Sequence, residues 1–508
     1  MDYPLKNRFL CGTSEILETV SQQAVDLDFT LPDYCADIEK ILKCSLIPKI
    51  YTRHFSAGQL RIDGASVISI LYCDSTKSAL RCCEQTVPFS ATIPVNSEAS
   101  ENIILTTAKS EYLNCRALSP RRLSAHGAFS LYASVIGKKT YEVSESCEDS
   151  DLQIRSLSEE VCELCEFTQE LFSVNEAVHL RARSNVETIV RSQVYAALTD
   201  IKESGDKIIL SGEATLRMLY ISDSATGETD QFVYVFPFSQ SIGSKDSGFD
   251  TTDIRLDVLC YDLMLKSEML SDEQMLNIDL KMCATVMGYK KKNITYISDA
   301  YSVKSETELK HEALPLCLDI KPINTSGVIK TPLSLGDKRI RKIVDIFNED
   351  ITVFLNIIEN NLQFSSKINV CILAITEEGE IVSIERQLDM DIAHPLDETF
   401  GYVTNGAARV TSISYRMSDN NEIELRLDLQ LFALGGTNRT ISQVTSAQST
   451  GDSLSQAAPA LTLYYALKDE CVWDIAKRYH TPIKSICDEN SLEEETLADD
   501  RMLLILRA

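Results

Sequence analysis

The sequence predicts a mainly β protein, built from three tandem, related β-sandwich-like domains followed by a small βααβ module. Three observations favour this fold class. Apolar and polar residues alternate along many segments, a spacing typical of strands with one buried face. A stretch near the N-terminus returns twice at constant offsets, as in a tandem repeat. The last part of the chain has a different composition and carries the helical spacing that the rest largely lacks.

The repeated stretch runs from Leu31 to Tyr72 and recurs at offsets of 148 and 302 residues. It begins with Leu31-Pro32-Asp33, continues through Asp37 to Leu42, and ends on the strand-like run Gly64 to Tyr72. The second copy keeps Asn185-Val186-Glu187, Gly212 and Leu219-Tyr220, and the third keeps Ile340, Ile343, Val344 and Asn369 to Ala374. Later matches join Ser119-Pro120-Arg121 with Ser271-Asp272-Glu273 and Ser418-Asp419-Asn420.

Repeat units of about 150 residues have the size of domains. We therefore predict domains at residues 1–150, 151–303 and 304–436, the third being the most degenerate. If the three share one fold, two sets of residues should be structurally equivalent. These are Leu71, Leu219 and Leu373 on one strand, and Ile38, Val186 and Ile340 at one buried position.

Period-two alternation predicts strands at 59–70, 128–135, 207–220, 254–265, 277–287 and 421–431. Strands with one wet face favour antiparallel sheets stacked as a sandwich. Two interruptions are expected. Asp33 to Leu42 has an acidic start and apolar residues at helical spacing, which predicts a short helix. Pro322 to Pro332 predicts an irregular loop within the third domain.

Residues 437–460 are rich in Ser, Thr, Gln and Ala and predict a flexible linker. Such a composition buries too little apolar surface to offset the entropy lost on ordering. Residues 461–508 then predict the βααβ module. It comprises a strand at Leu463 to Leu467, a helix with Trp473 and Ile475, a second helix after Pro482 with Ile486, and a strand at Met502 to Leu506.

Composition and charge exclude several classes of function. The net charge is −26, and basic residues form only short runs such as Lys290-Lys291-Lys292, which argues against nucleic acid and anionic membranes as partners. The chain holds no uncharged apolar run long enough to span a bilayer, and its first twenty residues lack the apolar core of a signal peptide. Sixteen cysteines without an export signal then predict reduced thiols in a cytosol.

The sequence contains few constellations that carry chemistry. The six histidines are scattered, and phosphate-cradling glycine loops and nucleophile elbows are absent. We therefore expect no enzyme activity and no cofactor. Cys162 and Cys165 have metal-ligand or redox spacing, but a second cysteine or histidine pair is missing, and tetrahedral zinc needs four ligands. Cys147 or Cys82-Cys83 could complete a site only by chance of folding, so buried thiols are the default interpretation.

The anchor residues Leu31-Pro32-Asp33, Asp37 to Leu42, Gly64, Leu71-Tyr72 and Pro88-Phe89 resemble the SPOCS domain of endospore-forming Firmicutes. Trp473 to Tyr479, with Asn490 and Leu503 to Ile505, is similar to a LysM module. The combination resembles SipL-type spore-coat assembly proteins. This resemblance implies a protein of the mother-cell cytoplasm that works at the forespore surface and spore coat. The partners it implies are the coat-basement morphogenetic ATPase and other spore-coat proteins.

The LysM resemblance also implies a glycan groove between two loops, made here by Lys468, Asp469, Glu470, Cys471, Asn490 and Asp500. Trp473, Ile475, Ile486 and Ile505 are expected to form the module core. Two departures argue against glycan binding. The usual Gly-Asp-Thr-Leu is Asp469 to Val472, and Asp500 replaces the glycine before the last strand. Glycine allows close approach of backbone to sugar, which aspartate does not.

Three hypotheses from different classes follow. The first is a non-enzymatic scaffold or adaptor that docks coat proteins onto the forespore through its β domains and LysM module. The alternative is a cell-wall-associated protein that binds peptidoglycan or chitin-type glycans through LysM. The third is a zinc or redox protein built on the cysteines.

Overall fold

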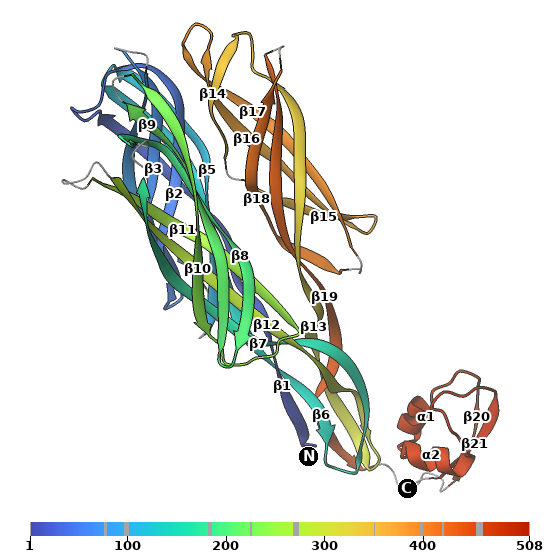
Figure 1. The fold of residues 1–508 in the computed structure, drawn as a ribbon. Helices are drawn as coiled ribbons and strands as arrows, with labels where there is room; N and C mark the ends of the chain where they lie inside the picture. The colour runs from blue at the N-terminus through green and yellow to red at the C-terminus, as the bar shows by residue number, and fades with distance from the viewer. Residues whose placement is uncertain are drawn as a thin grey trace.

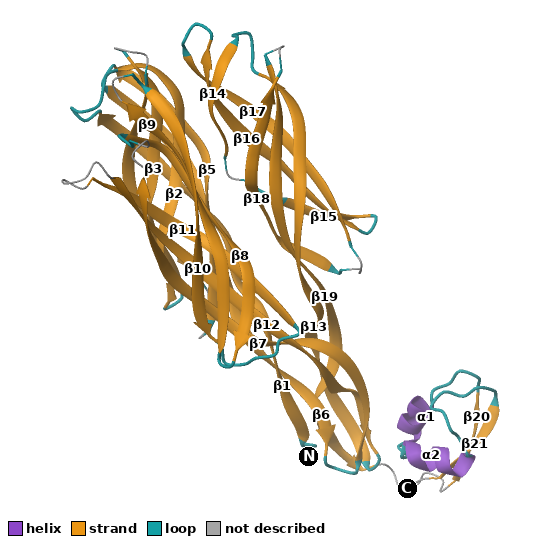
Figure 2. Ribbon diagram, viewed as in Figure 1, coloured by secondary structure: helices purple, strands orange, loops and turns teal. Residues whose placement is uncertain are grey.

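The structure is a computed structural model that describes residues 2–75, 79–95, 101–180, 185–223, 226–267, 274–349, 351–396, 400–418, 421–453 and 461–506. It is mainly β, with several small antiparallel sheets and two short helices within these residues. Figures 1 and 2 show an elongated body of long strands, with the N-terminus at its narrow end and the two helices in a separate C-terminal module. No described helix is long and apolar enough to cross a membrane.

The first six strands form two three-stranded sheets, ordered β1-β6-β5 and β2-β3-β4. They pack face to face around a core that contains Ile62, Ile70, Phe129 and Leu131. The strands are β1 (Leu5–Thr30), β2 (Ile38–Ser56), β3 (Gln59–Asp74), β4 (Leu80–Pro94), β5 (Asn102–Ser119) and β6 (Arg122–Cys147).

The next six strands repeat this arrangement in the sheets β11-β12-β7 and β10-β9-β8. Leu216, Tyr220, Leu280 and Met282 lie in the core between them. The strands are β7 (Leu152–Leu180), β8 (Thr188–Ser204), β9 (Lys207–Asp223), β10 (Glu228–Gly243), β11 (Thr251–Ser267) and β12 (Gln274–Ser302).

The third group forms the sheets β13-β19-β18 and β14-β16-β17, with a further short strand, β15. β14 and β15 pair with different halves of β16, so two short strands stand where the earlier groups have one long strand. The strands are β13 (Ser305–Ser334), β14 (Ile340–Asn348), β15 (Phe354–Ile358), β16 (Asn361–Thr376), β17 (Ile381–Pro395), β18 (Tyr402–Met417) and β19 (Glu422–Ser453).

The pairing registers of the three groups coincide at the offsets 148 and 302. Leu71, Leu219 and Leu373 each lie on the middle strand of a sheet. The residues opposite them, Lys43, Arg191 and Asp345, have the same spacing, and each follows a register shift. The three leucines are buried and share one hydrophobic cluster, so the three sheets meet at this point.

Gly64 and Gly212 lie inside strands, where an aromatic ring and a backbone carbonyl pack so close that a larger side chain would not fit. A Cβ on Gly64 would lie 2.1 Å from the carbonyl oxygen of Lys49 and 2.7 Å from the Phe89 ring. On Gly212 it would lie 2.4 Å from both a backbone carbonyl and the Phe238 ring. The glycines therefore make room for the aromatic residue paired opposite them. The third group has Ser366 opposite Met390 and needs no such space.

Six long strands extend into the narrow end of the body (Figure 1): β1, β6, β7, β12, β13 and β19. One residue or more from each strand enters a common cluster, so the three groups are also joined here. These residues are Leu10, Val143, Val161, Ile294, Tyr296, Leu314, Leu316 and Ile441.

The predicted helix at Asp33 to Leu42 is wrong. The segment turns at Pro32 to Cys35, where the Cys35 amide donates to the Pro32 carbonyl oxygen, and β2 begins at Ile38. The Arg121 guanidinium fixes the bend by donating to the carbonyl oxygens of Leu31, Pro32 and Cys35. Register shifts after Ile38 and Ile41 interrupt the alternation, and such bulges can imitate helical spacing in a sequence.

The predicted linker and the predicted loop at Pro322 to Pro332 also differ from the structure. Residues 437–453 belong to β19 and pair with β13, while residues 454–460 lie outside the described residues. The few apolar residues of this segment, Ile441, Val444 and Ala447, are all buried against neighbouring long strands. The two prolines lie on β13, an edge strand, where a missing amide donor is tolerated.

Ile38, Val186 and Ile340 are all buried. Ile38 and Ile340 are paired at the start of β2 and β14, and Val186 lies two residues before the first residue of β8. The matched triplet Ser271-Asp272-Glu273 lies outside the described residues, as do Asp419 and Asn420.

Candidate functional site

The C-terminal module consists of β20 (Leu461–Ala466), α1 (Val472–Tyr479), α2 (Ile483–Asn490) and β21 (Arg501–Leu506). β20 and β21 pair antiparallel, and the two helices pack on one face of this small sheet. The side chains expected in the core are buried: Trp473, Ile475, Ile486 and Ile505. The same cluster includes Tyr301 from β12, so the module core continues into the body of the protein.

α1 is held against the end of β12 by a polar contact centred on Asp299. The Trp473 indole Nε1–H donates to Asp299 Oδ2 at 2.8 Å, and the Lys477 ammonium donates to both carboxylate oxygens at 2.6 and 2.8 Å. The Tyr301 ring meets the Trp473 ring edge-on, with centroids 5.1 Å apart, and its hydroxyl donates to the Thr481 carbonyl oxygen. Trp473 is thus both a core residue and a contact to β12.

The charge of Asp299 is stabilised in this contact. Burial opposes ionisation of the carboxyl, but the hydrogen bonds from Lys477 and Trp473 outweigh it and lower the pKa of Asp299 below its ordinary value. An ionised acceptor between an indole and an ammonium group is a strong, charge-assisted arrangement. Sequence reasoning missed Asp299, because its two partners lie 174 and 178 residues away.

The first predicted groove loop is closed by its own hydrogen bonds. The backbone amide of Lys468 donates to Asp500 Oδ1 at 2.7 Å, which ties this loop to the one before β21. Glu470 accepts from the Tyr464 hydroxyl through one oxygen and from the Leu467 amide through the other, and these bonds lower its pKa. Asp469 has a φ of 66°, a backbone conformation that disfavours most side chains. Cys471 stands at the N-terminal end of α1.

Asn490, placed in the second groove loop, links α2 to β21. Its amide nitrogen donates to the carbonyl oxygens of Ile486 and Leu504, each at 2.8 Å, and its amide oxygen accepts from the Leu504 backbone at 2.7 Å. The side chain is therefore fully used inside the module. Of the predicted groove residues, Asp500 therefore binds the backbone amide of Lys468, and the Glu470 carboxylate binds Tyr464 and Leu467.

Asn490→Ala should therefore lower the free energy of unfolding of the module by about 2 kcal/mol, because the Leu504 amide loses its hydrogen-bond acceptor. Glu489→Ala, at an exposed neighbour on the same helix, should change stability by less than about 0.5 kcal/mol. Chemical denaturation followed by the fluorescence of Trp473, the only tryptophan of the chain, measures both variants. Equal stabilities for the two would contradict the linking role of Asn490.

The opposite face of the β20–β21 sheet is apolar and open. Leu463 is 63 % exposed, Tyr465 60 % and Met502 60 %. The register places Leu461 opposite Leu506, Leu463 opposite Leu504 and Tyr465 opposite Met502, so these side chains share one face. We define the outer face as Leu461, Leu463, Tyr465, Leu467, Met502, Leu504 and Leu506.

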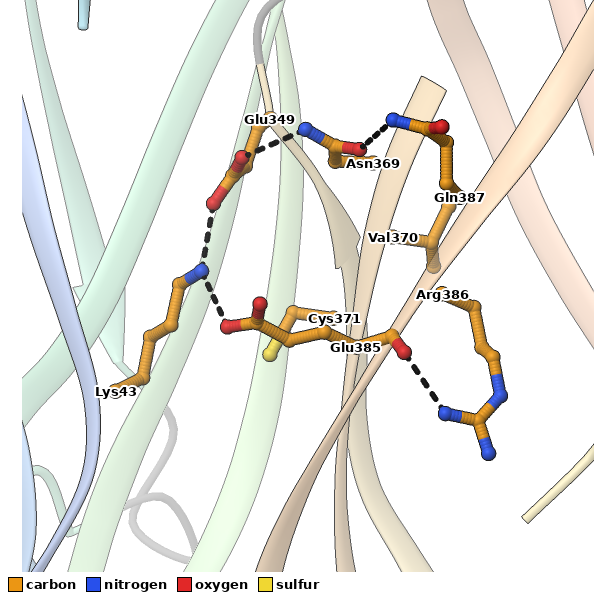
Figure 3. A pocket seen from close by; sticks show the side chains of 8 residues that line it. All are labelled: Lys43, Glu349, Asn369, Val370, Cys371, Glu385, Arg386 and Gln387. Atoms are coloured by element: carbon orange, nitrogen blue, oxygen red, sulfur yellow. Dashed lines mark hydrogen bonds and ion pairs between the residues drawn. The ribbon is translucent and has the colours of Figure 1, made fainter. Parts of the chain in front are cut away.

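A cavity of about 250 Å³ lies where β2 approaches β16 and β17 (Figure 3). Lys43 reaches Glu349 at 2.7 Å and Glu385 at 2.6 Å. Burial lowers the pKa of Lys43, but these two carboxylates outweigh that effect and raise it. Arg386 donates to the carbonyl oxygens of Ser334 and Glu385. The charges that line this cavity are thus paired with neighbours, and they join the first group of strands to the third.

The cysteines are free thiols in the structure. Cys162 donates to the Leu318 carbonyl oxygen and Cys165 to that of Glu163. A hydrogen bond with the Cys317 thiol lowers the pKa of Cys162. Among the described residues, no group of three or more His, Cys, Asp or Glu side chains could hold a metal ion.

Thiol titration of freshly prepared, denatured protein should therefore find close to all 16 cysteines reactive. The physical reason is that thiols stay unpaired in a reducing compartment, the one expected from the sequence. Metal analysis of the same preparation, before it is denatured, checks the zinc alternative for Cys162 and Cys165. If fewer than about half of the cysteines react as free thiols, the expectation of a reducing compartment is contradicted.

Comparison with known proteins places one segment in a described family. Residues 37–118 match the family described as SipL, SPOCS domain. The matched segment covers β2, β3, β4 and all but the last residue of β5. No curated protein and no solved structure matches the chain. The matched domain indicates a sporulation-related role in spore-coat assembly.

Proposed function

We propose that this chain is a non-enzymatic scaffold in endospore coat assembly. It acts in the mother-cell cytoplasm at the forespore surface, where its sheets and its C-terminal module contact coat proteins. The observation that carries the proposal is the match of residues 37–118 to the SipL SPOCS domain.

In this proposal the chain holds three SPOCS-like domains, of which the matched segment belongs to the first. Two observations support the other two. The strand groups β7 to β12 and β13 to β19 repeat the sheet order of β1 to β6. The residue pairs Lys43/Leu71, Arg191/Leu219 and Asp345/Leu373 also recur at the same place in their sheets. Three domains joined by shared buried clusters suit a scaffold, because such packing holds the surfaces that they offer at set distances.

The C-terminal module is proposed to be LysM-like and to bind protein rather than glycan. Its βααβ order supports the first part. The polar groups of Glu470, Asn490 and Asp500 already form hydrogen bonds within the module, which supports the second. A sugar would have to displace these internal bonds before it could use the same atoms.

The partners proposed are the coat-basement morphogenetic ATPase and other spore-coat proteins. The net charge of −26 favours protein surfaces with lysine and arginine over nucleic acid or anionic membranes. Cations of the chain are often paired internally, as Lys43, Arg121 and Lys477 are. They are therefore poorly placed to bind phosphates.

Co-purification from sporulating mother cells tests the proposal. The full chain and a chain that ends at Ser453 serve as tagged baits, and retained proteins are identified and quantified. We expect the full chain to retain the ATPase and coat proteins, and the shorter chain to retain less of the partner bound by the module. Retention of no coat protein by either bait, or recovery of the chain with peptidoglycan, would overturn the proposal.

A further inference from the structure

The outer face of the β20–β21 sheet is an unusual surface for a module of this size. Five of its seven side chains are about half exposed or more: Leu461 at 49 %, Leu463 at 63 %, Tyr465 at 60 %, Leu467 at 56 % and Met502 at 60 %. Leu461, Leu463, Tyr465 and Met502 share one face of the paired strands, and Leu467 directly follows β20. Contiguous apolar surface of this kind marks a contact site on a stable protein.

The module is oriented so that this face stays open. Its helices cover the inner face of the sheet, and α1 is held to β12 through Trp473, Lys477 and Asp299. The side of the module that meets the body is therefore the helical side. Figure 2 shows α1 and α2 toward the body, with β20 and β21 on the other side.

Charge decides between the occupants that an apolar face could take. Residues 461–508 hold six basic and ten acidic residues, a net charge of −4, in a chain of net charge −26. At the Leu467 end of the sheet three exposed acids, Asp469, Asp499 and Asp500, outnumber two exposed basic residues, Lys468 and Arg501. A second copy of the chain would bring like charges together, which opposes self-association. A protein segment with lysine or arginine beside its apolar side chains would instead be attracted.

A glycan suits the face less well. Sugars stack on aromatic rings and use hydroxyl hydrogen bonds, whereas this face has one aromatic ring, Tyr465, among aliphatic side chains. Aliphatic side chains gain most by burial against other apolar side chains.

We propose that the outer face docks an apolar segment of a partner protein whose neighbouring residues are lysine or arginine. This inference rests on the proposed function of the module as a protein-binding element. It adds the surface and the chemistry of the partner, and it places contact on the sheet rather than on the predicted groove loops.

Site-specific photo-crosslinking in sporulating cells tests this inference. A photoreactive amino acid replaces Leu463 in the full chain, or Asp474 on the exposed side of α1 as the control position. Cross-linked peptides are then sequenced. We expect Leu463 to capture an apolar, lysine- or arginine-containing segment of a coat protein, at least tenfold more than Asp474 does. Capture of a second copy of this chain, equal capture at both positions, or no capture would overturn the inference.

A matched pair of variants separates failure of this inference from failure of the proposed function. Leu463→Asp with Met502→Asp changes exposed side chains only, and Val233→Asp does the same on β10. We expect the double variant to retain at least tenfold less of the captured partner, and Val233→Asp to retain as much as the native chain. Unchanged retention by the double variant overturns the outer-face inference and leaves the scaffold proposal standing. If the native chain retains no coat protein, both the outer-face inference and the scaffold proposal are overturned.

Discussion

Leu373→Asp should destabilise the chain by about 4 kcal/mol or more, the largest effect expected of any single change discussed. Leu373 is fully buried where the three sheets meet, packed in one cluster with Leu71 and Leu219. A carboxylate there would lose its hydration and would lie opposite Asp345, a residue of like charge, in the strand register. Thermal and denaturant unfolding of the purified chain measure the loss.

The control for this change is Val233→Asp, which introduces the same charge on a side chain that is 59 % exposed. It should alter stability by less than about 0.5 kcal/mol. Leu71→Asp and Leu219→Asp should destabilise the chain less, because the strand register places a cation, Lys43 or Arg191, opposite each new carboxylate. Native-like stability of the Leu373 variant would contradict the packing of the three sheets at this shared cluster.

Asp299→Ala should release α1 from β12 and lower the stability of this contact by about 3 kcal/mol at neutral pH. The substitution leaves the Trp473 indole N–H and the Lys477 ammonium without their acceptor in a partly buried contact. Because Trp473 is the only tryptophan, its emission reports this contact directly and should shift to longer wavelength. Asp474→Ala, at an exposed acid on the same helix, should leave the emission unchanged.

The same contact should weaken in acid. The pKa of Asp299 is lowered in the folded chain, so its stabilising effect is complete above the ordinary value of 3.8 and is lost as pH falls through the folded value. A pH titration of tryptophan emission should show a transition below about pH 4 that Asp299→Ala lacks. Circular dichroism separates this step from loss of the sheets. Identical titrations of the native chain and the variant would count against the role of Asp299.

The mainly β class was predictable because alternation survives in most strands. Leu425, Leu427 and Leu429 of β19 are spaced by two residues and are all buried. The constant offsets likewise identified Leu71, Leu219 and Leu373, which occupy equivalent pairing positions. Periodicity and repetition are local properties of a sequence, so they can be read without knowledge of the tertiary contacts.

Two local features misled the sequence reasoning for identifiable reasons. The bulges after Ile38 and Ile41 shift the strand register, so apolar residues of a strand took on helical spacing. The end of β19 holds few large side chains, yet Ile441 and Val444 suffice because both meet other long strands. Burial there depends on partners from distant parts of the chain, which composition alone does not reveal.

The candidate site was predictable only in part. The residues of the module core could be placed from helical spacing, but the contact of Trp473 with Asp299 joins positions 174 residues apart. The groove residues were chosen by resemblance, and the structure engages Glu470, Asn490 and Asp500 in internal bonds. The outer face had a readable signal, because six of the seven residues from Leu461 to Leu467, all but Thr462, are apolar or aromatic, so such side chains fall on both faces of β20.

Binding of the purified chain to the purified coat-basement ATPase tests the central claim most directly. The assay compares the full chain with the chain that ends at Ser453, in the presence and absence of a chitin oligomer. The account predicts that the full chain binds the ATPase, that removal of the module weakens binding at least tenfold, and that the oligomer does not compete. Tight binding of the oligomer without binding of the ATPase would contradict the account and favour a glycan-binding protein.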